Sequence, residues 1–214
     1  MPFFEFPHFV TGDRSKIKPV FLNDEQYGLA LDCLVKACTD LLVLDGDRPD
    51  SKVLLGKRIV EPQPDWWFMG GRMRCGESPE ASVVRLVRRE LQLDLAGERF
   101  RALTTNSYAW AKREQPPKEN GTCDISVVFT LVLTPEEVRT IHLDEKEYSD
   151  VRWFSIDEII AGDFHPALRS AARDLKTRQI FDNLKSAVAN ESDDKSLAYA
   201  ARHLVASWAT RPEL

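Results

Sequence analysis

The spacing of apolar residues changes along the chain, and each spacing predicts a different kind of element. Two apolar runs at 36–44 and 52–58, separated by turn residues, are typical of neighbouring strands. An aromatic run at 66–69 predicts a further short strand, which leads into two glycines. Over 79–91 the apolar positions instead recur every three or four residues, and this period predicts a helix.

Strand-like runs return in the second half of the chain, at about 101–111, 124–133 and 150–154. The polar segment 112–122 between the first two is long for a connection, and loops of this length are commonly lids or binding loops. Strands, one helix, more strands and then terminal helices predict an α+β fold, an α/β/α sandwich around a mixed sheet.

We expect one domain over residues 1–214, with a core at about 30–170. The phenylalanine-rich segment 1–22 reads as an arm that packs its aromatic rings on the main body. A helical extension at about 165–210 ends in a helix with one apolar face, which includes Trp208. That face could cover its own domain or a second copy of the chain, so a homodimer is possible.

Composition narrows the class of protein. Hydrophobic residues make up 43% and charged residues 29% of the chain, as in ordinary globular proteins. The net charge of −5, without a dense basic run, argues against a nucleic-acid partner. The sequence shows no apolar run of the length that a membrane span needs, and no signal peptide at its start.

The four cysteines show neither a CxxC pair nor a zinc spacing, which predicts reduced and mostly buried thiols. Together with the absence of a signal peptide, this pattern indicates a cytoplasmic protein.

A loop that enters the predicted helix carries the candidate chemistry. Gly71 is followed by Glu77, then Arg85, then Glu90, at intervals of six, eight and five residues. Ser78 can cap the helix, and the proline after it suits the first helical position. An ion pair between Glu77 and Arg85 would fix the shape of the loop, and a remaining carboxylate could face a cation.

These residues resemble the Nudix box, and the resemblance extends over about 30–170. Three positions depart from the family pattern. Leu86 and Arg89 stand where the family usually has glutamates, and Gln92 replaces the closing glycine. A site with so few carboxylates holds at most one divalent ion easily, since an arginine repels a neighbouring cation.

The reduced box is similar to that of the nucleotide-sugar branch of the family, typified by GDP-mannose mannosyl hydrolase. The resemblance rests on 54–58, on 66–72 and on 85–91. It implies a Mg²⁺-dependent hydrolase of a nucleoside diphosphate linked to a sugar, in which water attacks the anomeric carbon and a C–O bond breaks.

The same resemblance implies a role for each candidate residue. The metal ligands would be the Gly70 carbonyl, Glu90 and Glu147, while Arg58 and Arg72 would bind the leaving diphosphate. It also implies four catalytic residues, namely Arg72, Glu77, Arg85 and Tyr148.

Tyr148 stands where the branch has its general-base histidine. A phenol with a pKa of about 10 is protonated at neutral pH and is a poor base. Other candidates near it in the sequence are His142, Asp144, Glu145 and Glu147.

Two other functions remain open at the level of sequence. One is a pyrophosphatase that cleaves a P–O bond of a nucleoside diphosphate derivative. The other is a binding or regulatory module that kept the fold and lost efficient catalysis, as Leu86, Arg89 and Tyr148 would suggest. The separation of the Glu90 and Glu147 carboxylates discriminates between a metal site and a binding module.

Overall fold

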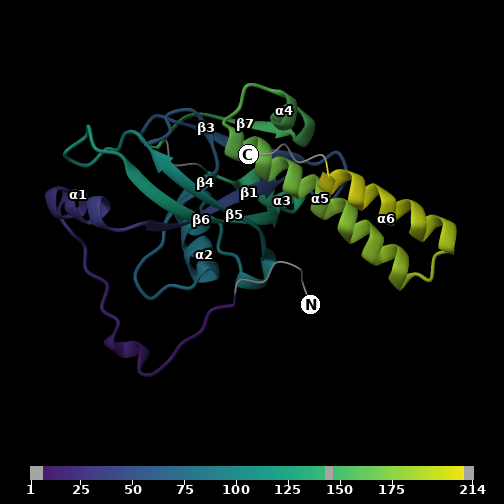
Figure 1. The fold of residues 1–214 in the computed structure, drawn as a ribbon, viewed down its shortest axis with the longest axis horizontal. Coiled ribbons are helices and arrows are strands. Elements are labelled where there is room, and N and C mark those ends of the chain that lie inside the picture. The colour runs from purple at the N-terminus through teal and green to yellow at the C-terminus, as the bar shows by residue number, and fades with distance from the viewer. Residues whose placement is uncertain (1–6, 143–146, 210–214) are drawn as a thin grey trace. The chain divides into compact units, whose positions relative to one another are not determined.

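The computed structural model describes residues 7–142 and 147–209, and the chain divides after Ser155 into two compact units. The first unit contains a seven-stranded sheet with strand order β3-β2-β1-β6-β5, in which β4 also pairs with β1 and β7 with β2 (Figure 1). The strands are β1 (Lys36–Leu44), β2 (Lys52–Arg58), β3 (Trp66–Trp67), β4 (Met69–Arg72), β5 (Phe100–Trp110), β6 (Thr122–Val132) and β7 (Tyr148–Ser155). Only β1 and β6 among the paired strands of this sheet run parallel, which confirms a mixed sheet in an α+β fold.

Two strands, β2 and β4, pair with different halves of the same edge of β1, and β4 leads into the box loop. Val43 and Leu44 pair with β2, whereas the earlier half of β1 pairs with β4, so that Asp40 lies opposite Gly70. The approach is so close that a Cβ on Gly70 would come within 2.3 Å of the Thr39 carbonyl oxygen. Only glycine therefore fits this position without moving the backbone.

Helix α2 (Pro79–Glu90) confirms the predicted helix. The Ser78 hydroxyl accepts a hydrogen bond from the Ala81 amide, as expected for the cap. The buried face of α2 contains Val83, Leu86 and Val87 and packs on β1 and β4 (Figure 1), whereas Ala81 is exposed. Fully burying a side chain of this size contributes about 1.5–3 kcal/mol, so this face anchors the box to the sheet.

The first unit contains further short helices. These are the 3₁₀ turns η1 (Arg14–Lys16) and η2 (Gly97–Arg99), α1 (Asp24–Cys33) and α3 (Pro135–Thr140). The sequence did not predict α3, because six residues are too few to show a helical period. A reciprocal pair of hydrogen bonds between Thr134 and Glu137 caps it instead.

Two predictions about the surface were wrong. Phe9 and Phe21 in the N-terminal arm are 85% and 73% exposed, so neither ring is buried against the body, although the Arg74 guanidinium lies over the Phe21 ring at 5.6 Å. The remaining arm phenylalanines, at positions 3, 4 and 6, lie outside the described residues. The thiols are mostly exposed, since only Cys38 of the four free cysteines is buried.

The second unit consists of three helices. They are α4 (Ile156–Ala161), α5 (Pro166–Ala189) and α6 (Asp194–Ala209), and α5 and α6 form a hairpin (Figure 1). The hydroxyls of Thr177 and Ser207 bridge the hairpin at 2.8 Å. Among the helices described, none is both long and apolar enough to pass through a membrane.

Candidate functional site

The box loop is held by the ion pair that its spacing predicts. Arg85 donates from Nε to Glu77 Oε1 at 2.5 Å and from Nη2 to Glu77 Oε2 at 2.8 Å. The same Nη2 donates to the Arg72 carbonyl at 3.0 Å, which ties the loop to the end of β4. Burial by itself would raise the pKa of Glu77, but hydrogen bonds from Arg85 and from the Arg74 amide lower it overall. Glu77 and Arg85 therefore shape the loop as an ionised pair.

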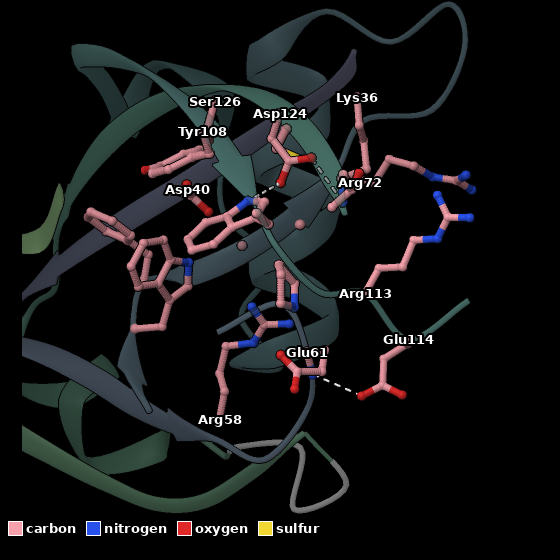
Figure 2. A pocket seen from close by; sticks show the side chains of 18 of the residues that line it. Lys36, Asp40, Arg58, Glu61, Arg72, Tyr108, Arg113, Glu114, Asp124 and Ser126 are labelled. Carbon is pink, nitrogen blue, oxygen red and sulfur yellow. Dashed lines mark hydrogen bonds and ion pairs between the residues drawn. The ribbon is translucent and has the colours of Figure 1, made fainter. Parts of the chain in front are cut away.

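A pocket opens beside this loop and collects residues from β1, β2, β4, β5, β6 and β7. Asp40, Tyr108, Asp124 and Ser126 lie together in the pocket, and Arg58 and Glu61 lie apart from them (Figure 2). Arg58 and Arg72 both line the pocket, and within the described chain neither forms an ion pair. The pocket thus offers two cationic side chains to an anionic ligand.

Three aromatic rings form one wall of the pocket. The Tyr108 and Trp110 rings are stacked, with centroids 5.0 Å apart, and Trp67 meets Trp110 edge-on at 5.6 Å. The Trp110 indole nitrogen donates to Asp124 Oδ2 at 3.0 Å, and Lys36 pairs with Asp124 Oδ1 at 3.1 Å. A flat apolar surface of this kind can pack against a nucleobase or a sugar ring.

Asp40 is a buried carboxyl group in the same pocket, with 7% of its surface exposed. Burial raises the pKa of Asp40 to about 7, against the lowering effects of Ser126 and Arg58. A group that titrates near neutral pH can exchange a proton with a reacting ligand.

The long loop predicted between β5 and β6 covers part of this pocket. Arg113, only 2% exposed, donates to Asp32 Oδ1 at 2.5 Å, to the Gln115 carbonyl at 3.1 Å and to the Gly121 carbonyl at 3.2 Å. Farther along, the Glu61 amide donates to Glu114 Oε1 at 2.9 Å (Figure 2). The loop is therefore an ordered wall, built around one buried guanidinium.

Tyr148, which lines the pocket, contacts the buried Glu90. The Tyr148 hydroxyl donates to Glu90 Oε2 at 2.6 Å, and its ring lies so close to Gly56 that a Cβ there would come within 2.3 Å of it. Burial and then the Glu90 charge raise the pKa of Tyr148 well above its ordinary value. This environment makes Tyr148 a hydrogen-bond donor to Glu90 and disfavours it as a general base.

Of the other candidate bases, His142 is exposed at the surface and Asp144 and Glu145 lie outside the described residues.

Burial raises the pKa of Glu90, while the hydrogen bond from Tyr148 and the charge of Arg89 lower it. Glu90 is 1% exposed, and its buried carboxylate is held by these two side chains and by the Gly70 amide, which donates to Oε2 at 3.3 Å.

The three oxygen groups expected to bind Mg²⁺ do converge, on Arg89. Its Nη2 lies 3.5 Å from the Gly70 carbonyl oxygen and 3.7 Å from Glu147 Oε1, and it forms a hydrogen bond and ion pair with Glu90 Oε1. Oxygen donors of this kind suit Mg²⁺. The space among them, however, is filled by a guanidinium nitrogen, so a Mg²⁺ ion does not fit while Arg89 stays in place. No cluster of three or more acidic, histidine or cysteine side chains suited to a metal occurs in the part of the chain described.

Sequence reasoning missed Asp40, Tyr108 and Trp110 as pocket residues. A signal for Asp40 was available, because it is a charged residue inside an apolar strand. Tyr108 and Trp110 alternate along β5, so they point to the same face of the sheet, but the sequence does not say which face is concave.

Comparison with known proteins finds one matching domain family and several similar solved structures. A family model described as NUDIX domain matches residues 36–175. A MutT NUDIX hydrolase from Burkholderia pseudomallei is similar in structure, with a TM-score of 0.52 and 19% identity over 66% of this chain and 98% of that one. The E. coli dihydroneopterin triphosphate pyrophosphohydrolase also has a TM-score of 0.52, with 20% identity over 68% of this chain and 99% of that one.

A MutT/nudix family protein from Enterococcus faecalis is 22% identical, with a TM-score of 0.44 over 57% of this chain, and the match spans 44% of that protein's length. At these identities the Burkholderia and E. coli structures are evidence of a common fold alone, while the family model shows the membership of residues 36–175.

Proposed function

The chain belongs to the NUDIX domain family, hydrolases of nucleoside diphosphate derivatives, and on that premise we propose that its substrate is a nucleotide sugar. The observation that carries this proposal is the pocket beside the box loop, in which Arg58 and Arg72 accompany an aromatic wall. The arginines suit a diphosphate, and the wall suits the flat or apolar face of a base or sugar.

We propose further that the bond broken is the C–O bond between the sugar and the diphosphate. Water adds to the anomeric carbon, the diphosphate oxygen leaves with the bonding electron pair, and a base takes the proton from water. Arg58 and Arg72 stabilise the negative charge that grows on the leaving diphosphate. Asp40 lines the same pocket, and burial raises its pKa to about 7, so it suits the role of proton acceptor that Tyr148 is unsuited to fill.

Divalent metal ions are general in this family, and we keep Mg²⁺ as part of the proposal. Gly70, Glu90 and Glu147 would hold it when Arg89 has moved away, and the ion would neutralise diphosphate charge there. Glu77 and Arg85 act from a distance, since their ion pair fixes the loop that carries Arg72.

The test is hydrolysis in ¹⁸O-labelled water across a panel of nucleotide sugars and dinucleotides, with products separated by mass. Label in the free sugar supports C–O cleavage, whereas label in the phosphate would establish attack on phosphorus and a pyrophosphatase. Arg72→Gln should depress kcat by more than it raises KM, because the charge on the leaving group grows in the transition state. Arg74→Gln is the matched control, since this exposed arginine two residues away does not line the pocket.

One observation favours a second function, that of a binding or regulatory module. Arg89 occupies the oxygen donors that a metal-dependent hydrolase would need. Calorimetric binding of a nucleotide sugar, with no product formed in the presence of Mg²⁺, would select this function over hydrolysis.

A further inference from the structure

We propose that Arg89 is a built-in cation that takes the place of a divalent metal, so that Arg89 and Mg²⁺ exclude each other at Gly70, Glu90 and Glu147. This exclusion acts on metal binding by the free protein. It does not depend on which substrate is hydrolysed, or on whether one is hydrolysed at all.

The geometry at a single nitrogen carries the proposal. Arg89 Nη2 contacts a backbone carbonyl and two carboxylates that come from three separate segments, namely β4, the end of α2 and the residue before β7. These three oxygens face one cationic atom, and oxygen donors are also the ligands that Mg²⁺ prefers. Two cations cannot share it, because their repulsion is large at so short a distance in a partly buried setting.

The burial of the Glu90 carboxylate explains why a positive charge is needed beside it. Glu90 is 1% exposed, and a buried carboxylate without a positive partner is strongly unfavourable. Tyr148 supplies one hydrogen bond to it but no charge. The Arg89 guanidinium supplies the charge, from a side chain that is 44% exposed.

That exposure gives Arg89 a route out of the cluster. Because the side chain is partly open to solvent, it can leave without unfolding α2, and β4 and α2 hold the Gly70 and Glu90 oxygens that it vacates. The wild-type protein should therefore bind Mg²⁺ weakly, because the free energy needed to displace Arg89 is subtracted from the free energy of Mg²⁺ binding.

The test is Mg²⁺ binding to the ligand-free protein, measured by isothermal titration calorimetry in the wild type and in Arg89→Ala. We expect the Mg²⁺ dissociation constant to be about tenfold lower in the variant, because the competing positive charge is gone. Arg88→Ala is the matched control. It removes an arginine from the adjacent position of the same helix turn, and that arginine pairs with the exposed Asp94 rather than with the cluster.

Thermal unfolding gives a second, independent test of the exchange between Arg89 and Mg²⁺. Removal of Arg89 leaves Glu90 buried without its positive partner, so Arg89→Ala should unfold at a lower temperature than the wild type. Millimolar Mg²⁺ should recover much of this loss in the variant, with little effect on the wild type. If Arg89→Ala does not fold, Arg89→Gln is the second variant, because it keeps a polar, though shorter, side chain with an amide donor and no charge.

Equal Mg²⁺ affinity in the wild type and both Arg89 variants would overturn the proposal, whether that affinity is high, low or undetectable. So would a gain in Arg88→Ala as large as in Arg89→Ala, because it would show a general effect of net charge. Neither result depends on turnover, so a failure of the proposed hydrolysis can be told apart from a failure of this inference.

Discussion

Replacing Asp40 with asparagine should stabilise the protein, and the gain should grow with pH. In the unfolded chain this carboxyl group loses its proton near its ordinary pKa of 3.8, whereas burial raises the pKa in the folded protein to about 7. Between these values the folded protein binds one proton more than the unfolded chain. The contribution of Asp40 to the free energy of unfolding therefore falls as pH rises from 4 to 7, and levels off above 7.

The size of this change in stability follows from the difference between the two pKa values of Asp40. The step from 3.8 to about 7 amounts to on the order of 4 kcal/mol, at about 1.4 kcal/mol per pH unit. The substituted asparagine carries no charge at any pH, so the variant escapes this loss. The gain of Asp40→Asn over the wild type should be larger at about pH 8 than at about pH 5, by roughly 3 kcal/mol.

Urea unfolding at several pH values measures this difference. Asp47→Asn serves as the control, because Asp47 is an exposed aspartate in the loop between β1 and β2. A gain from Asp40→Asn that stays constant with pH, or one that Asp47→Asn reproduces, would refute the reasoning.

Three further substitutions test the framework around the pocket. Arg85→Gln should cost about 1–3 kcal/mol and lower Tm, because Glu77 keeps a partly buried charge without its partner; an unchanged Tm would contradict this. Tyr148→Phe should cost about 1–2 kcal/mol in urea unfolding through loss of the hydrogen bond to Glu90, and a neutral result would mean that water replaces it. Arg113→Met should speed proteolytic cleavage of the loop that Arg113 holds, and an unaltered cleavage rate would show that other contacts order it.

Local features of the chain could be predicted because local physics decides them. The boundaries of β1 and β2 agree with their apolar runs, and α2 begins at the predicted cap, where serine and proline satisfy a helix start. The ion pair between Glu77 and Arg85 could be predicted for the same reason, since eight residues across a loop and a helix turn leave few alternatives. The short α3 escaped prediction because its stability comes from its caps and not from a repeating apolar pattern.

The tertiary structure decided what lies in the pocket and which cation stands at the candidate metal ligands. Asp40, Tyr108 and Trp110 come together only because β1, β5 and β6 are neighbours in the sheet, and strand order is a long-range property that no local pattern encodes. The sequence by itself marked Arg89 as a residue that would repel a metal ion. Only the folded chain, with β4 opposite β1 and Glu147 just before β7, shows the guanidinium against the same oxygens that a metal ion would bind.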